Sequence, residues 1–402
     1  MNTGTAHKIA RRRVAPLWAR WNDELDARYT LGVEEEVMLL DAERLSLAQC
    51  GDEVLERLSE ELRANTSPET HAAVLELTTG VQPDVDGVLD ELRLLRFRLA
   101  EELNAMGLAA AAAGTHPLTV PTETEVSAAP RYRVLEASLR MLAHREPTMA
   151  LHVHVGVPAP EDAVRVLNGL RRHLALLLAL SANSPFLQGS DSGFASARTV
   201  VFQAFPRTGP PRRFSDYADY VGAVDALIAS TAIPDPSFVW WDVRLQPTLG
   251  TVEVRVMDAQ AELEDVAPLV ALIQSLAPHE LEGEPSRATP SAEALAENRF
   301  LAARDGMDAR LIDAGGRRLV PARDMLEVLV GECLPHAFAL GCVGALERVF
   351  QLADRGGADR QRQIATHGGT LADVVSTLAD RFLAPGMDRP TLDLPIVRRW
   401  TP

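Results

Sequence analysis

Two histidines stand two residues apart in the segment MALHVHVGVPAP, residues 149–160, where valines alternate with them. This alternation is typical of a β-strand, because successive side chains of a strand point to opposite faces of the sheet. His152 and His154 then share one face, and the valines form the other. Two imidazoles on one strand face can hold a metal ion, a phosphate or an acid, so this face is a candidate site.

Four glutamates have the same placement on other predicted strands: Glu34 and Glu36 in YTLGVEEEVMLLD, Glu76 in AVLELTTGV, and Glu253 in GTVEVRVMD. Hard cations such as Mg2+ select oxygen ligands and keep waters for substrate phosphates. We therefore predict a magnesium site that these four glutamates form with one of the two imidazoles. A solvated acidic face is the alternative reading of the same residues, and the spacing of the two histidines also occurs at zinc sites.

Arginines accompany these acids. Arg244 and Arg255 lie in the middle of predicted strands on the polar face, where an unpaired guanidinium would be costly, so we expect them to pair with acids or anionic ligands. Arg198 and Arg207 belong to residues 184–215, which are rich in Ser, Gly, Pro and Arg. A loop of that length inside a compact domain is uncommon unless it has a function.

The elements that must position these residues follow from the apolar periodicity. Five segments alternate apolar and polar residues as strands do, and the last two form a predicted hairpin that turns at residues 247–250. Glu35 falls on the apolar face of the first strand, whereas Met257 is expected on the polar face of the last. Helices are predicted at about residues 50–64, 88–103 and 160–178, and in most of the chain after residue 262, with a loop at residues 278–291. We expect an α+β fold divided into a lead-in (1–28), a sheet with helices (29–285) and a helical part packed on the same domain (286–402).

Composition excludes several classes of function. The formal net charge of −16 argues against nucleic-acid binding, and no apolar run is long enough for a membrane span. Three scattered cysteines argue against a disulfide scaffold and favour a reducing cytoplasm. Lys8 is the single lysine among 40 basic residues, so no lysine is available in the core to bind phosphate or form a Schiff base.

The order of motifs resembles a known family, the carboxylate-amine ligases of the type 2 glutamate-cysteine ligase group. The resemblance covers roughly residues 30–310 and rests on LGVEEEVMLLD, LELTTGV, GTHP, RYRVLE, LHVHVGVP, LSANSPFLQGSDSGFASARTVVFQAFPRTGPP, GTVEVRVMD and ENRFLAARDGMDA. It implies a curved, mostly antiparallel sheet that forms a half-open cradle for ATP and Mg2+, with helices on its outer face. It also implies a reaction in which a carboxylate is phosphorylated by ATP and then captured by an amine. The chain departs from the usual pattern at Met149–Leu151 and at Asp305, which affects the choice of substrates rather than the acids.

The resemblance assigns expected roles to the candidate residues. These are metal binding for Glu34, Glu36, Glu76, His152 and Glu253; catalysis for Arg198 and Arg255; substrate binding for His154, Gln203 and Arg207; and nucleotide binding for Arg244, Arg299 and Arg304, with Glu69 as a further acid. The expected partners are a small carboxylate and an amine, with glutamate and cysteine favoured, and with no nucleic acid or membrane. The sequence leaves open whether the protein forms a homo-oligomer. The alternatives are a metal-dependent hydrolase that uses the histidine strand, and a family member that binds ligands without catalysis.

Overall fold

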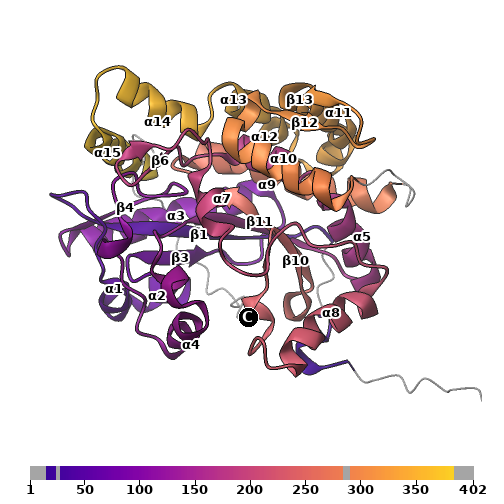
Figure 1. Cartoon of the computed structure of the whole chain (residues 1–402), viewed down its shortest axis with the longest axis horizontal. Coiled ribbons are helices and arrows are strands. Elements are labelled where there is room, and N and C mark those ends of the chain that lie inside the picture. Colours follow the sequence, from indigo (N-terminus) through magenta and orange to yellow (C-terminus); the bar gives the residue numbers. More distant parts are fainter. Residues whose placement is uncertain (1–14, 24–27, 284–289, 384–402) are drawn as a thin grey trace, which may run out of the picture.

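A seven-stranded antiparallel sheet forms the centre of the molecule (Figure 1). The computed structural model describes residues 15–23, 28–283 and 290–383. The strands are β1 (Leu31–Asp41), β2 (Thr66–Pro68), β3 (Val74–Thr78), β4 (Leu108–Ala111), β5 (Ala150–Gly156), β10 (Val243–Gln246) and β11 (Thr251–Asp258). Their order is β10-β11-β5-β1-β3-β2, and β4 pairs with β1 beyond the end of its pairing with β5. The sheet is therefore open, with β10 and β2 at its edges.

Three helices cover the apolar face of this sheet: α3 (Val85–Asn104), α5 (Pro160–Leu170) and α9 (Leu263–Glu282). The alternate valines of the strands pack against them, and Val33, Val153 and Val254 are at most 1% exposed. Burial of these side chains contributes about 1.5–3 kcal/mol each to folding. The polar face of the sheet consequently points away from these helices.

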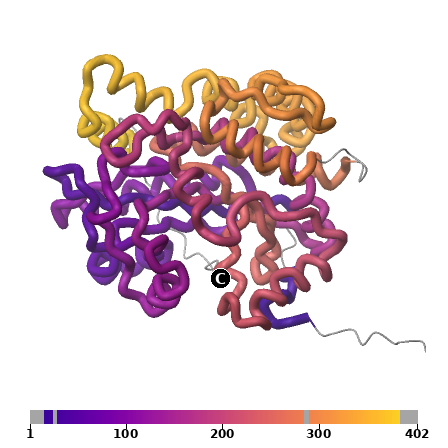
Figure 2. Tube along the Cα trace, viewed as in Figure 1, coloured from indigo at the N-terminus to yellow at the C-terminus, as the bar shows by residue number. Residues whose placement is uncertain are grey.

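The remaining helices lie around the sheet and behind the helices that cover its apolar face (Figures 1 and 2). They are α1 (Gly51–Arg57), α2 (Glu60–Ala64), α4 (Pro130–Leu139), α6 (Leu174–Ser181), α7 (Ala197–Phe202), α8 (Tyr217–Ala229), α10 (Ala292–Asp305), α11 (Ala322–Leu340), α12 (Val343–Glu347), α13 (Val349–Asp354), α14 (Gly357–Thr366) and α15 (Leu371–Phe382). Of the helices after residue 290, α10 packs on α6, α11 and α12 pack on α9, and α15 packs on β4. The predicted α+β fold, with an open antiparallel sheet and helices on its outer face, is confirmed.

Several predicted element boundaries were wrong. The segment at residues 50–64 is two helices, because Ser59 caps α2 by accepting a hydrogen bond from the Leu62 N–H at 3.4 Å. The segment at residues 160–178 is also two helices, and the side chains of Arg172 and His173 at the break bind Glu280 of α9.

Two segments predicted as loops contain helix. Residues 184–215 contain the short helix α7, whose N-cap is Ser196. Helix α9 continues through Pro278 to Glu282, because burial on nearly all sides outweighs the cost of an internal proline. The rest of that predicted loop, residues 284–289, and most of the predicted lead-in, including Lys8, lie outside the described residues.

Glu35 forms a buried ion pair beneath the sheet. Its side chain and that of Arg96 on α3 are both fully buried, and Arg96 Nε donates to Glu35 Oε2 at 2.8 Å. The guanidinium also donates to the backbone carbonyls of Gln260, Ala261 and Phe382. The middle glutamate of the EEE run thus ties the first strand to α3 and to the chain after β11.

A β-bulge changes the phase of β11. Val254 pairs with Val153 and Met257 pairs with Leu151, so β11 has one residue more than β5 between these pairs. Met257 is therefore on the apolar face with Leu151, which corrects the prediction that it shares a face with Glu253 and Arg255. The same bulge turns the following residue, Asp258, to the polar side.

A substitution at Gly250 tests the geometry of the hairpin turn between β10 and β11. Its φ is +68°, and a Cβ at this position would overlap the backbone carbonyl oxygen of Asn22. We expect Gly250→Ala to lower the free energy of unfolding by about 1–3 kcal/mol in urea titrations. Gly222→Ala is the control, because that exposed position in α8 has open space and Ala raises helix stability by up to about 1 kcal/mol. Equal stability of the two variants would contradict the claim that the backbone at residue 250 excludes a Cβ.

Two further observations concern the chain as a whole. None of the helices in the described residues has both the length and the apolar character needed to cross a membrane. Cys50, Cys333 and Cys342 form no disulfide bond in the part of the chain that the structure describes.

Candidate active site

Acids and histidines from four strands face one another on the polar side of the sheet. In the strand register, Glu34 of β1 is opposite His152 of β5, and Glu36 of β1 is opposite Glu76 of β3. On the next strand pair, Glu253 of β11 is opposite His154. Directly opposed residues have Cβ atoms about 4.5–5.5 Å apart, so the sheet itself brings these groups into contact.

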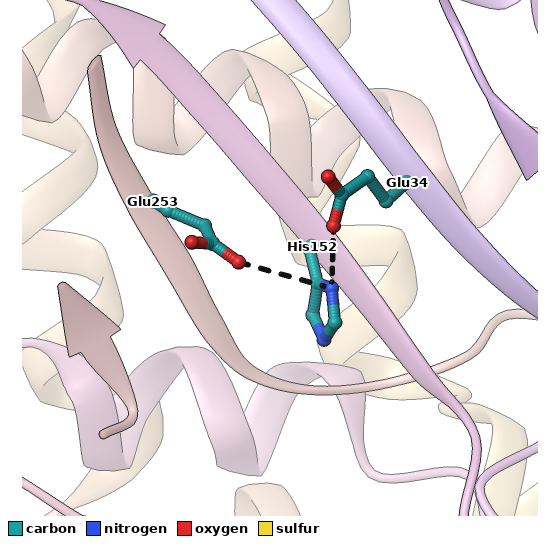
Figure 3. A group of neighbouring side chains, drawn as sticks. All are labelled: Glu34, His152 and Glu253. Atoms are coloured by element: carbon teal, nitrogen blue, oxygen red, sulfur yellow. Dashed lines mark hydrogen bonds and ion pairs between the residues drawn. The ribbon is translucent and has the colours of Figure 1, made fainter. Parts of the chain in front are cut away.

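His152 is the centre of this group (Figure 3). Its Nδ1 lies 3.0 Å from Glu34 Oε2 and 4.0 Å from Glu253 Oε1. On the other side of the ring, Nε2 lies 3.6 Å from Glu36 Oε1. The imidazole is 2% exposed, so these carboxylates surround it in place of water.

The side chains form two sets that could hold a metal ion. Glu34, His152 and Glu253 have ligand atoms within 4.8 Å of one another, as do Glu36, Glu76 and His152. Carboxylate oxygens outnumber nitrogen ligands in both sets, and no thiolate takes part. This donor chemistry suits Mg2+ or Mn2+ better than the softer metals.

Like charges and burial raise the pKa values at one end of the group. Burial, followed by the negative charge of Glu69, raises the pKa of Glu36 to about 8. Burial and the charges of Glu34 and Glu69 raise the pKa of Glu76 well above its usual value. Directly opposed carboxylates repel each other unless a proton or a cation lies between them, and a divalent cation removes this repulsion.

At the other end of the group, the guanidinium groups of Arg244 and Arg255 compensate the charge of Glu253. Burial would raise the pKa of Glu253, but the charges of Arg244 and Arg255 outweigh burial and hold that pKa well below its usual value. Arg244 Nε donates to Glu253 Oε2 at 2.5 Å, Gln246 Nε2 donates to the same oxygen at 2.7 Å, and Arg255 Nη1 donates to Oε1. As the sequence predicted, Arg244 and Arg255 pair with an acid.

Glu34 is held ionised by the two histidines. Burial would raise its pKa, but the charge of His154 and the hydrogen bonds of both histidines outweigh burial and lower it. His154 Nε2 lies 3.3 Å from Glu34 Oε1, and its Nδ1 lies 3.1 Å from Thr251 Oγ1. Burial and the charge of Arg255 lower the pKa of His152 to about 4, so this imidazole is neutral at pH 7 and can act as a ligand.

The polar face is the floor of a cavity of about 420 Å³. One wall comes from residues 67–71 and α4, and the other comes from α7, η4 (Pro236–Phe238) and β9 (Trp240–Trp241). The lining residues are Glu34, Glu36, Ser67, Pro68, Glu69, Thr70, His71, Val74, Glu76, Ala129, Arg131, Tyr132, Leu135, Leu139, Thr148, His152, Arg198, Phe202, Phe205, Ser237, Trp240, Arg244, Gln246, Leu249 and Arg255. The cavity has the size and the mixed character of a small-molecule site.

Two guanidinium nitrogens in this cavity are buried without a hydrogen-bond acceptor in the described part of the chain. These are Nε of Arg198 and Nε of Arg255. A buried donor left unpaired costs about 1–3 kcal/mol. An anion that enters the cavity together with a divalent cation could accept hydrogen bonds from both of these nitrogens.

The structure separates the remaining candidate residues. His154 and Glu253 lie behind the cavity floor, and Glu69 lines the wall. Gln203 is exposed, and Arg207 stacks on Trp240 with its Nε bound to the Phe238 carbonyl at 2.8 Å. Neither of these two lines the cavity, so their substrate-binding roles stay predictions.

Of the three arginines predicted to bind nucleotide, Arg244 lines the cavity, whereas Arg299 and Arg304 do not. Arg299 is buried and pairs with Asp242 at 2.7 Å. Arg304 is exposed and pairs with the neighbouring Asp305 at 2.7 Å. Their nucleotide-binding roles likewise stay predictions.

Sequence reasoning missed two features of the site. The apolar part of the wall, with Phe202, Phe205 and Trp240, has no signal in the sequence, because its aromatic residues come from separate short segments. Asp258 was also missed, since regular alternation places it on the apolar face. A count that allowed one extra residue in VEVRVMD would have found it.

An open antiparallel sheet with helices on one face and a charged cavity on the other places the protein in a fold shared by solved ligases. The structure is similar to the glutamate–cysteine ligase of Francisella tularensis in complex with AMP, with a TM-score of 0.65, 13% identity, and coverage of 91% of this chain and 90% of that one. It is also similar to a bifunctional glutathione synthetase from Pasteurella multocida, with a TM-score of 0.61, 14% identity, and coverage of 89% of this chain and 51% of that one. At these identities the likeness shows the fold alone.

The sequence defines the family. Residues 30–377 match the family model described as glutamate-cysteine ligase family 2. Two proteins of Rubrobacter xylanophilus, provisionally named glutamate–cysteine ligases 2-1 and 2-3, are 42% and 40% identical over 354 residues, which are 88% of this chain and 94% and 96% of theirs. A protein of Thermobifida fusca, provisionally named glutamate–cysteine ligase 2, is 36% identical over 365 residues, 89% of this chain and 92% of its own. The chain belongs to glutamate-cysteine ligase family 2.

Proposed function

We propose that this protein is an ATP-dependent ligase that joins a carboxylic acid to an amine through an acyl phosphate. The observation that carries the proposal is the convergence of Glu34, Glu36, Glu76 and His152 in one cavity, with Glu253 behind its floor. Beside them are two buried arginine nitrogens that have no acceptor among the described residues. Phosphoryl transfer requires the protein mainly to position the reacting groups and to neutralise their charge. Clustered acids that hold Mg2+ and arginines that hold phosphate oxygens supply both.

The proposed reaction has two steps, transfer of the phosphoryl group to the acid and transfer of the acyl group to the amine. An oxygen of the substrate carboxylate attacks the γ-phosphorus of ATP, and the bond from that phosphorus to the bridging oxygen breaks, which releases ADP. The amine nitrogen then attacks the carbonyl carbon of the acyl phosphate and loses a proton to water or a carboxylate. Inorganic phosphate departs with one oxygen from the substrate carboxylate.

The residues of this chain have separate tasks in that scheme. Mg2+ held by the glutamates and His152 would neutralise the phosphate charges. Arg198 and Arg255, whose Nε atoms face no acceptor in the described residues, would bind the oxygens of the transferred phosphoryl group. The aromatic wall and the residues of α4 would exclude water, so that the acyl phosphate meets an amine before it is hydrolysed.

The names of similar proteins support a choice of substrates. The relatives are provisionally named glutamate–cysteine ligases, and the Francisella tularensis enzyme of similar fold was solved with AMP. We propose glutamate as the acid, cysteine or another amine as the acceptor, ATP as the phosphoryl donor, and the cytoplasm as the location.

A labelling experiment tests the mechanism. Phosphate release is measured with ATP, Mg2+ and a panel of acids and amines, and the active acid is then supplied with 18O in its carboxylate. We expect one 18O atom in each phosphate released. Turnover without ATP would support the hydrolase alternative, and the absence of ATP consumption with every pair would contradict the proposal and favour a binding role.

Magnesium binding should release protons. Burial and the charge of Glu69 raise the pKa of Glu36 to about 8, so this carboxyl holds a proton at pH 7 that a cation must displace. The pKa of the neighbouring Glu76 is raised in the same direction. We expect calorimetric titration with Mg2+ and a non-hydrolysable ATP analogue, in buffers of different ionisation enthalpy, to show release of about one proton at pH 7. The affinity should rise with pH up to about 8.

Glu36→Gln is the matched variant, because it removes the titrating group and keeps its shape. Its proton release should fall by about half or more if Glu36 carries the proton. Magnesium binding without any proton release in the wild-type protein would contradict the assignment of these carboxyls as ligands.

A further inference from the structure

Asp258 is a buried carboxylate next to the proposed site that none of the proposed steps uses. It is 0% exposed, and the bulge in β11 turns it toward the loop before α7 and the N-terminus of that helix. Its Oδ2 accepts hydrogen bonds from the Asn183 N–H at 2.9 Å and from Ser184 Oγ at 2.6 Å. Its Oδ1 accepts from Ser196 Oγ at 2.8 Å. A charge at this depth is costly unless it is hydrogen-bonded, and both oxygens of Asp258 accept hydrogen bonds.

The same carboxylate is the acid nearest to Arg198. Asp258 Oδ1 lies 3.7 Å from Arg198 Nη1. The Arg198 N–H donates to Ser184 Oγ at 3.2 Å, so Ser184 connects the backbone of Arg198 to the side chain of Asp258. The N-cap of α7, Ser196, is bound to Asp258 as well.

The guanidinium of Arg198 is fixed by the bulge itself. Nη1 donates to the Val256 carbonyl at 3.2 Å and Nη2 donates to the Arg255 carbonyl at 3.3 Å. Both carbonyls belong to the bulge between Val254 and Met257, which places Asp258 on this side. With Nη1 and Nη2 held in this way, Nε is the one nitrogen of the Arg198 guanidinium without an acceptor among the described residues. The side chain of Arg198 lines the cavity.

Gly114 shows how closely the carboxylate is packed. A Cβ at this position would lie 2.6 Å from Asp258 Cγ and 2.7 Å from Ser184 Oγ. The carboxylate of Asp258 therefore packs directly against the backbone of Gly114. Asp258 is thus linked to the backbone of Arg198 through Ser184 and lies 3.7 Å from its guanidinium, so it can determine where that arginine stands.

We propose that Asp258 is a positioning residue: with the β11 bulge and Ser184, it holds the Arg198 guanidinium in the one orientation that reaches the transferred phosphoryl group. This inference rests on the proposed function and adds a residue that does not touch substrate. Its effect should appear in kcat rather than in the KM for ATP, because misplacement of a catalytic group by about 1 Å can cost about 100-fold in rate.

The test is a double-mutant cycle on phosphate release. We expect Asp258→Asn to lower kcat by about 10- to 100-fold, with less than a threefold change in the KM for ATP. Arg198→Met should lower kcat by at least as much. The double variant should be no slower than Arg198→Met, because Asp258 acts through Arg198. Losses that multiply in the double variant, or wild-type kcat in Asp258→Asn, would overturn the inference.

Chemical rescue separates positioning from a structural role. Guanidinium ion in the assay should restore part of the activity of Arg198→Ala, and it should fail to do so in Asp258→Asn/Arg198→Ala. Equal rescue in both backgrounds would overturn the inference. If Asp258→Asn does not fold, Ser184→Ala replaces it in the cycle with an expected loss of about 3- to 10-fold, and Ser192→Ala, in the same loop but bound to the Pro185 carbonyl, is its control.

These outcomes are distinct from failure of the proposed function. Wild-type protein that consumes no ATP with any acid and amine would overturn both. Wild-type turnover with additive losses in the cycle would overturn the role of Asp258 alone.

Discussion

Glu34→Gln is expected to lower ATP-dependent phosphate release by at least about 100-fold, while the variant keeps the fold of the wild-type protein. The substitution removes one negative charge and preserves the shape of the side chain. Glu34 contacts both histidines, at 3.0 Å and 3.3 Å, and shares a candidate metal set with His152 and Glu253. An amide is a poor ligand for Mg2+, so the phosphates of ATP would lose a cation at the point where charge develops.

The measurement is phosphate release at saturating substrate, with thermal unfolding as a check of the fold. Glu327→Gln is the matched control, because this glutamate is exposed on α11 and should leave the rate unchanged. A Glu34→Gln variant as active as this control would remove Glu34 from the proposed mechanism.

Arg96→Met should lower the free energy of unfolding by about 3–5 kcal/mol. The substitution leaves the carboxylate of Glu35 buried and without its cation, and it removes hydrogen bonds to three backbone carbonyls. Neither side chain has any exposed surface, so water cannot replace the lost contacts. Urea unfolding measures the effect directly.

The double variant Glu35→Leu/Arg96→Met separates charge from packing. A buried ion pair replaced by apolar side chains of similar size is often neutral or stabilising, so we expect the double variant to regain most of the loss. A single Arg96→Met variant that loses less than about 1 kcal/mol, or a double variant less stable than the single, would contradict this account of the pair.

The alternation of residues in the strands carried most of the information about the floor of the site. Period-two alternation predicted correctly that Glu34, Glu76 and His152 share one face, since each strand presents alternate residues to the cavity. The same pattern located Glu35 on the helix side, although the sequence contained no sign that Arg96 would be its partner. Pairing across 61 positions depends on how α3 packs, which local patterns do not encode.

The parts that sequence failed to predict are those where the chain departs from regular geometry. One extra residue in β11 reversed the faces of Met257 and Asp258, and the pairing with β5 reveals it. The walls of the cavity come from short irregular segments, such as η4 and α7, whose approach is set by tertiary contacts. Gln203 and Arg207 lie close in sequence to Arg198, but only Arg198 lines the cavity, because α7 and the following turn direct the three side chains differently.

Anomalous scattering from Mn2+ in crystals grown with a non-hydrolysable ATP analogue tests the central claim most directly. We expect peaks about 2.1 Å from carboxylate oxygens of Glu34, Glu36, Glu76 or Glu253, with phosphate oxygens of the analogue completing the coordination. Nucleotide bound elsewhere on the molecule, or Mn2+ bound away from these glutamates, would contradict it.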